Sequence, residues 1–488
     1  AISFVIDNDD GNRISKLKLT PRLLAKLLTE SYPGNALMKN SYAALSDNPV
    51  NITKDPEFQA LNPGLPEYVN QEAASTLLNL SSEADLIYAL TSYIDADPEA
   101  RAWLDGTPDP WGMKVNPSYK GISLPVYSWP LQDSTLAPQS YIDSGNNPCY
   151  TYSPTPYLQL IANPTAFVSN IVLNMQYAIS NVNTECPNGD PRDVSTLRLS
   201  IQGRQQPGFR FVLGVVPLSS VSRYGLTAAS LQSGPGGESS SRSSDAVPLS
   251  GRTFVAGTDA GMRAAAQLFK ADAAAKSWSV DYDALRTTAG KTAYPGTIPV
   301  YADIPVTGLT KSTAARLAQL LRFAAGTGQK TGLANGELPP GYLPLIKANG
   351  LAAFADYTER AAQAVEAQKS FIPFLDPKDD PKPPSDTTNP PSGNGLDNPT
   401  GSLPNQASNP GGPTGSGVEV TNPVAGQPVE AMALKTPGDH SVLARLGLPV
   451  LLALGLALGL AGAFLRWKAP LEAAAAPLLR DLTNRAKR

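Results

Sequence analysis

Histidine and cysteine, the residues on which much enzyme chemistry depends, are almost absent from this chain. Its 488 residues include a single histidine, His440, and two cysteines. A Ser-His-Asp or Cys-His nucleophile needs an imidazole beside it, and zinc sites usually need histidines or several cysteines. His440 lies just before an apolar C-terminal segment, outside the expected globular region. We therefore expect no catalytic residue, no metal site and no cofactor, and predict that the protein is not an enzyme.

A strong excess of charge is missing as well. The 39 basic and 42 acidic side chains give a net charge of -3, which lacks the positive surface that nucleic-acid binding requires. Nucleic acid is therefore not an expected partner. The length and the 42% hydrophobic content are sufficient for one large or two medium domains.

The two cysteines, Cys149 and Cys186, are too few for a four-thiolate metal site. They are enough for one disulfide in an oxidising compartment. We predict that they pair, and two buried free thiols are the alternative.

Long hydrophobic runs are absent except near the C-terminus. Residues 446–465 read LGLPVLLALGLALGLAGAFL and carry no charge, which predicts a transmembrane helix because about 20 residues span the ~30 Å hydrocarbon core. The segment that follows, 466–488, is basic, so the positive-inside rule places this tail in the cytoplasm. The predicted localisation is the cell membrane, with a single pass and with the N-terminal bulk of the chain outside the cell.

The segment before this helix, 373–440, is rich in Pro, Gly, Ser and Asn and poor in large apolar residues. Such a composition cannot pack a core, so we predict a disordered stalk. A similar run, SGPGGESSSRSSD, predicts a flexible insertion over 233–248 in the globular region 1–372.

Within 1–372, apolar runs typical of strands alternate with amphipathic segments typical of helices. AISFVI at 1–6 and RFVLGVV at 210–216 predict strands, and Thr20 followed by Pro21 predicts the start of a helix. Ser82 and Asp85 have capping-box spacing, Asn163 with Pro164 is expected to cap a longer helix, and Thr258 is expected to cap one that runs to Lys270. This alternation favours an α/β fold of two lobes.

Several stretches resemble a known family. They are LKLTPRLLAKLLTES at 17–31, DPEFQALNPGLP at 55–66, RFVLGVVPLSSVSRYGL at 210–226, AYPGTIPVYADIP at 293–305 and LPPGYLPL at 338–345. In this order they resemble the type II periplasmic-binding fold of the phosphate-binding proteins of ABC importers, in the surface-anchored variety of Gram-positive envelopes. The resemblance implies a two-lobed receptor for a small solute or anion. The family's first strand and helix have no counterpart here, so the fold is expected to be incomplete at its N-terminus.

The resemblance also implies a binding site. The family holds phosphate with backbone N–H groups and hydroxyls at helix N-termini and with an arginine, and the corresponding hydroxyls here would be Ser81 and Ser82, with Ser219 and Ser220 facing them. No Lys or Arg lies between Lys54 and Arg101, and nine acidic residues crowd that segment. An altered or degenerate anion site is therefore expected, and ordinary helix capping is the alternative role of Ser81 and Ser82.

Two functions follow as hypotheses. The first is a membrane-anchored solute-binding-like protein that delivers its ligand to an ABC transporter or meets a cell-wall partner. The second is a structural or adhesive surface protein that uses the same fold for partner binding. Aromatic residues next to prolines, as in PDPWG at 108–112, predict either an aromatic surface for a glycan or peptide or loop packing.

Overall fold

The computed structural model describes residues 1–68, 71–139, 142, 149–152, 155–186, 192–193, 196–235, 249 and 251–380. The predicted stalk beyond Asp380, the predicted membrane span 446–465 and the tail 466–488 lie outside these residues. So do residues 236–248 of the predicted insertion, whereas Ser233 is buried in a strand. Among the helices of the described ranges, none has the length and apolar character needed to cross a membrane.

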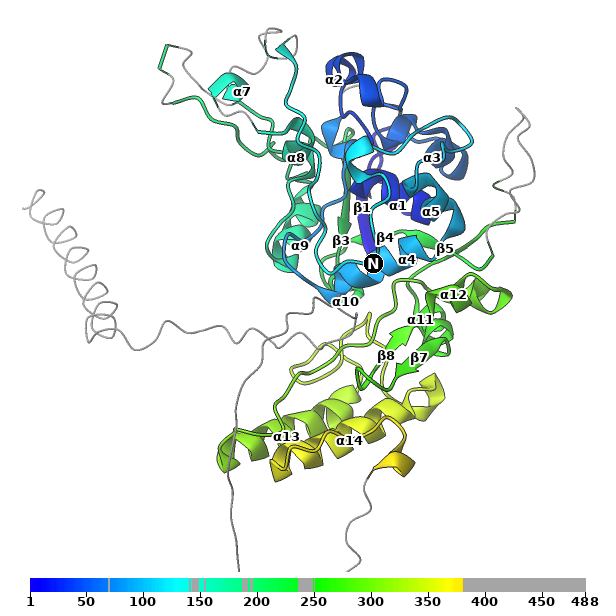
Figure 1. Cartoon of the computed structure of the whole chain (residues 1–488), viewed down its shortest axis with the longest axis vertical. Helices are drawn as coiled ribbons and strands as arrows, with labels where there is room; N and C mark the ends of the chain where they lie inside the picture. The colour runs from blue at the N-terminus through cyan, green and yellow to red at the C-terminus, as the bar shows by residue number, and fades with distance from the viewer. Residues whose placement is uncertain are drawn as a thin grey trace, which may run out of the picture. The chain divides into compact units, whose positions relative to one another are not determined.

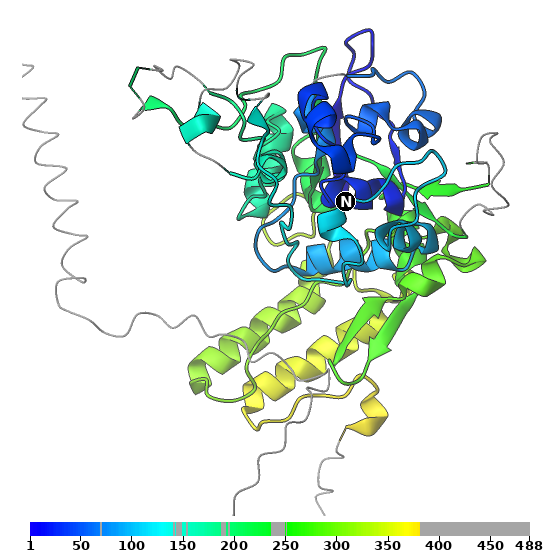
Figure 2. The ribbon, with the colours of Figure 1, turned by 45° about the horizontal axis from the view of Figure 1, so that its top comes forward.

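The protein has a mixed α/β fold with small sheets (Figures 1 and 2). The strands are β1 (Ile2–Ile6), β2 (Lys18–Leu19), β3 (Phe211–Val215), β4 (Thr227–Ala228), β5 (Ser230–Ser233), β6 (Thr253–Val255), β7 (Phe269–Asp272) and β8 (Ser277–Val280). The helices of the first half are α1 (Pro21–Leu28), α2 (Ala36–Ser41), α3 (Pro56–Leu61), α4 (Asp85–Asp95), α5 (Pro98–Leu104), α7 (Cys149–Tyr152), α8 (Tyr157–Ala162) and α9 (Val168–Tyr177). Those of the second half are α10 (Leu218–Arg223), α11 (Asp259–Ala266), α12 (Tyr282–Leu285), α13 (Lys311–Ala325) and α14 (Ala352–Ala367).

The central sheet has the order β3-β1-β4, and β1 runs antiparallel to both neighbours. Two further segments extend it beyond β3, because Leu78 pairs in parallel with Gly214 and Leu80 pairs in parallel with Thr165. Helix α9 packs against β3 so closely that a Cβ atom on Gly214 would lie 2.8 Å from the Met175 sulfur. A glycine is needed at this position because the helix leaves no room for a side chain.

A second sheet has the order β2-β5-β6, with β2 parallel and β6 antiparallel to β5. Helices α1, α4 and α5 contact one another (Figure 1). Their apolar side chains lie in the main hydrophobic core together with those of β1 and β3. Within α1, Leu23, Leu24, Leu27 and Leu28 are all buried.

The rest of the described chain forms a hairpin and a helix pair. Strands β7 and β8 pair with each other, and Trp278 of β8 stacks on Phe354 of α14 with ring centroids 4.3 Å apart. Helices α13 and α14 lie side by side around a small core of alanines and aliphatic side chains (Figures 1 and 2). Residues 373–380, the first of the predicted stalk, contact α14, since Arg360 donates to the carbonyl of Phe374.

The structure corrects several expected boundaries. Helix α4 begins at Asp85 with Ala84 as N-cap and without a side-chain cap, so the predicted capping box at Ser82 is wrong. Asn163 ends α8, and the next helix, α9, begins only at Val168. Thr258 does cap α11, but the helix ends at Ala266 because the chain then enters β7.

The predicted pairing of the cysteines is confirmed. Cys149 of α7 and Cys186 form a disulfide with their Cα atoms 5.7 Å apart. It links two segments that are 37 residues apart in the sequence.

Candidate functional site

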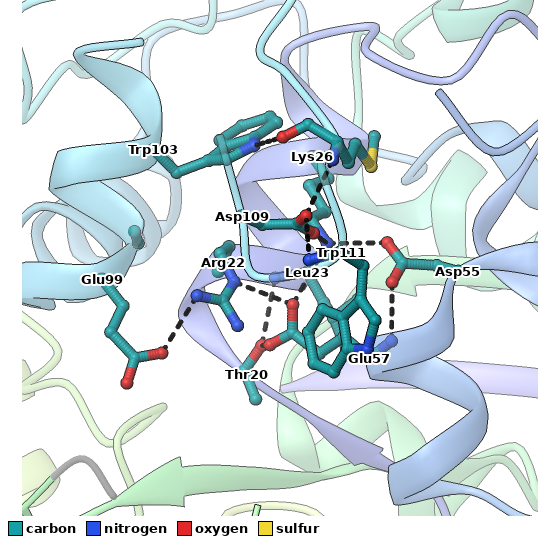
Figure 3. Close-up of polar contacts among 12 residues, drawn as sticks. Thr20, Arg22, Leu23, Lys26, Asp55, Glu57, Glu99, Trp103, Asp109 and Trp111 are labelled. Atoms are coloured by element: carbon teal, nitrogen blue, oxygen red, sulfur yellow. Dashed lines mark hydrogen bonds and ion pairs between the residues drawn. The ribbon is translucent and has the colours of Figure 1, made fainter. Parts of the chain in front are cut away.

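The most distinctive polar feature of the described chain is a buried lysine surrounded by carboxylates (Figure 3). The Lys26 ammonium lies 2.7 Å from an oxygen of Asp55, 3.1 Å from Glu57 and 2.7 Å from Asp109. The side chains of Lys26, Asp55 and Glu57 are fully buried, and that of Asp109 is 1% exposed. We call these four residues the Lys26 cluster.

Each carboxylate of the Lys26 cluster has one oxygen on the ammonium and the other on a nearby turn or cap. Asp55 is the N-cap of α3, and its Oδ1 accepts from the backbone N–H of Glu57 at 2.9 Å. Oδ1 of Asp109 accepts from the N–H groups of Trp111 and Met113 at 3.0 and 2.8 Å. Glu57 Oε1 accepts from the hydroxyl of Thr20, the N-cap of α1. The cluster therefore fixes two helix starts and one turn around a single cation.

Arg22, one turn before Lys26, brings a second cation to Glu57. Its Nε donates to Glu57 at 2.9 Å. Burial alone would raise the pKa of Glu57, but the Lys26 ammonium and the Arg22 guanidinium lower it to about 2. Burial raises the pKa of Asp55 despite its contact with Lys26, and it also raises the pKa of the Tyr32 hydroxyl, which donates to Asp55 at 2.8 Å.

The three carboxylates could hold a metal ion by their spacing alone, because one oxygen from each lies within 4.8 Å of the others. The Lys26 ammonium, however, lies within 3.1 Å of all three. It is therefore where a metal ion would be, and the pKa of Lys26 is raised by these carboxylates, against the effect of burial. The residues present fit a buried ion-pair network.

Further ion pairs connect this region to the second sheet. Glu99 of α5 accepts from Arg22 at 3.1 Å and from Arg252 at 2.8 Å, and Arg252 also donates to Gln232 of β5. Arg286 pairs with Asp97, the N-cap of α5. Since all of these side chains are mostly buried, the pairs tie α1 and α5 to β5 and to the residues before β6.

These contacts show what part of the acidic segment after Lys54 does in the fold. Four of its carboxylates, those of Asp55, Glu57, Asp97 and Glu99, pair with cations from outside that segment. Glu83 and Asp85 remain exposed at the start of α4. The positive partners were invisible in the local sequence because they come from residues 22–26, 252 and 286.

The predicted ligand serines lie at one edge of the central sheet. The segment 78–80 runs parallel to β3, so both leave the sheet at the same edge. Ser81 and Ser82 follow the first segment, and Ser219 and Ser220 follow the second, in α10.

The hydroxyls of the first pair already have protein partners. Ser81 donates to the carbonyl of Thr165 at 3.2 Å, and Ser82 donates to that of Ala166 at 3.4 Å. Neither caps α4, so the capping role considered from the sequence is wrong. Both residues are exposed, whereas Ser219 and Ser220 are half-buried.

The segment around Gly341 lies against Ser219. A Cβ atom at Gly341 would be 2.4 Å from the Ser219 backbone nitrogen, and Gly341 has φ +93°. The backbone of LPPGYLPL therefore covers the first turn of α10, which has only six residues.

No protein-family model matches the chain, and comparison with curated proteins and with solved structures gives no match either. The resemblance to phosphate-binding proteins consequently rests on the sequence stretches quoted above.

Proposed function

We propose that the described region is the binding part of a membrane-tethered, extracytoplasmic solute-binding-like protein with two lobes. The observation that carries the proposal is the shared sheet edge of Ser81, Ser82, Ser219 and Ser220. In α/β proteins, ligands bind outside the carboxyl ends of parallel strands, where loops and helix starts gather. The uncharged run 446–465 and the basic tail after it support the tether.

The ligand of this edge is more consistent with a neutral solute than with phosphate. Glu83 and Asp85 are exposed beside Ser81 and Ser82, and carboxylates at a helix start repel a second anion. No ion pair or hydrogen bond within the described ranges brings an arginine to these serines.

A second function, adhesion or scaffolding without a small-molecule site, is favoured by one specific contact. The close approach of Gly341 to Ser219 fills part of the space that a solute would use at α10. In that case the sheet edge with these serines is a packing contact within the protein, and the outer surface binds the adhesion or scaffolding partner.

Calorimetric titration of the full chain in detergent with phosphate, sulfate and a panel of neutral solutes tests the proposal. Saturable binding that is weakened in a Ser81→Ala/Ser82→Ala variant supports a solute-binding protein. Ser46→Ala is the matched control, because Ser46 is another serine whose hydroxyl donates to a backbone carbonyl, at 3.0 Å from that of Ala43. If no solute binds while the protein still unfolds cooperatively, the adhesive function replaces the proposal.

A further inference from the structure

A groove of about 460 Å³ lies beside the Lys26 cluster. Its apolar lining includes Val50, Met113 and Trp111, and its polar lining includes Lys39 and Asp47. This volume falls in the range of small-ligand sites, roughly 300 to 1,000 Å³. The groove shares no residue with the sheet edge that carries Ser81, Ser82, Ser219 and Ser220. Binding in the groove can therefore be tested independently of the proposed function.

The Lys26 cluster holds two walls of this groove. Asp55 lies between the lining residues Lys54 and Pro56, and Asp109 accepts from the backbone N–H groups of the lining residues Trp111 and Met113. Both carboxylates are held by the same buried ammonium. A binding surface gains affinity and specificity when its side chains are held in place before the ligand arrives.

Two further contacts fix the groove. The Arg22 guanidinium lies 5.9 Å from the centre of the Trp111 ring (Figure 3). Asn48 ties the 47–50 segment to the Trp111 turn, since it donates to the carbonyl of Lys114 at 2.8 Å and accepts from its N–H at 3.0 Å. The half-buried indole is therefore a rigid aromatic surface in a groove with polar groups.

The charges of the groove indicate the class of ligand. Lys54 pairs with Glu67 and Asp47 pairs with Lys114. Within the described ranges no carboxylate lies in ion-pair range of Lys39, so one cationic group of the lining is uncompensated. An acid group on the ligand would pair with it.

We propose that this groove binds a short acidic oligosaccharide. The C–H face of a sugar ring packs on an indole, which Trp111 provides. The hydroxyls of the sugar form hydrogen bonds with amides and carboxylates, which Asn40 and Asp47 provide. Its carboxylate pairs with Lys39.

The test uses the full chain in detergent and two matched probes, trigalacturonate and its methyl ester, which has the same rings without the charges. Tryptophan fluorescence and calorimetry measure binding. We expect saturable binding of trigalacturonate, and binding of the ester that is weaker by roughly fivefold, as for loss of one partly exposed ion pair.

Two variants separate the contributions. Trp111→Ala weakens binding of both probes by about tenfold or more, because both lose the aromatic surface. Lys39→Gln lowers the affinity for trigalacturonate to that for the ester and leaves the ester unaffected. Tyr127→Ala, which removes another exposed aromatic ring, changes neither affinity, and thermal melts confirm that each variant is folded.

Three results would overturn the proposal. They are no saturable binding of trigalacturonate at millimolar concentration, equal affinity for the acid and the ester, and unchanged affinity in Trp111→Ala.

Discussion

Replacing Lys26 with methionine tests the account of the buried cluster most directly. Methionine has a similar length and no charge, so the change removes the ammonium without leaving a large cavity. Within the described ranges, Lys26 is the cation that contacts Asp55 and Asp109, so both lose their ion pair, while Glu57 keeps Arg22. Removing one partner from a buried ion pair typically costs about 3 to 5 kcal/mol.

The same magnitude follows from proton uptake. Asp55 and Asp109 lie close enough to share one bound proton, and for an ordinary aspartate binding one proton costs about 4 kcal/mol at pH 7 and about 1.5 kcal/mol at pH 5. The variant's carboxylates therefore have folded-state pKa values above those of the unfolded chain, and their penalty grows as the pH rises. We expect Lys26→Met to lower the free energy of unfolding by about 3 to 5 kcal/mol at pH 7. At pH 5 this loss should be smaller by roughly 2 kcal/mol.

Denaturant unfolding of the full chain, followed by tryptophan fluorescence, measures this difference because Trp103 and Trp111 lie beside the cluster (Figure 3). Lys54→Met is the matched control. Lys54 also pairs with a carboxylate, that of Glu67, but its side chain is 32% exposed, so its loss should cost less than about 1 kcal/mol. The reasoning is refuted if the two variants are equally destabilised at pH 7, or if the Lys26→Met deficit does not shrink at pH 5.

Three other predictions concern different parts of the fold. Burial raises the pKa of Glu30 from 4.5 to about 8, so the free energy of unfolding should fall as the pH rises through this interval, and Glu30→Gln should flatten that slope in pH-dependent melts. Cys186→Ser should lower stability by up to ~4 kcal/mol in the chain-entropy model, and reductant should then have no further effect on the melting temperature. Gly341→Ala should lower the free energy of unfolding by about 1 to 3 kcal/mol more than Gly112→Ala in denaturant unfolding. Both glycines have φ above +90°, but of the two only Gly341 would place a Cβ atom against a neighbour. Equal losses would show that the Ser219 contact is absent.

Local sequence signals predicted elements where a single residue determines the boundary. Thr20 with Pro21 starts α1 and Thr258 starts α11, because caps act within one turn. The predicted capping box at Ser82 failed for a tertiary reason. The hydroxyls of Ser81 and Ser82 donate to the carbonyls of Thr165 and Ala166. No pattern near residue 82 indicates that the segment 78–80 pairs with Thr165.

The Lys26 cluster was missed because its members are far apart in the sequence. Lys26 lies in a helix whose other residues predict an ordinary amphipathic surface, where a lysine is expected to face solvent. Asp109 is 83 residues away. The one available signal was the PDPWG turn, in which an aspartate and a tryptophan lie two residues apart, and it predicted only an aromatic surface or loop packing.

Stability is a weak reason for a protein to bury such a cluster, since a well-packed apolar core of similar volume is often as stable or more so. Apolar side chains, however, could not accept hydrogen bonds from the backbone N–H groups of Glu57, Trp111 and Met113. The carboxylates satisfy these donors and, through Lys26, hold the start of α3 and the Trp111 turn at a fixed separation. The cluster therefore contributes more to the placement of these two segments than to stability. A variant that replaces it with apolar residues should retain the fold, but the start of α3 and the Trp111 turn should no longer be held at a fixed separation.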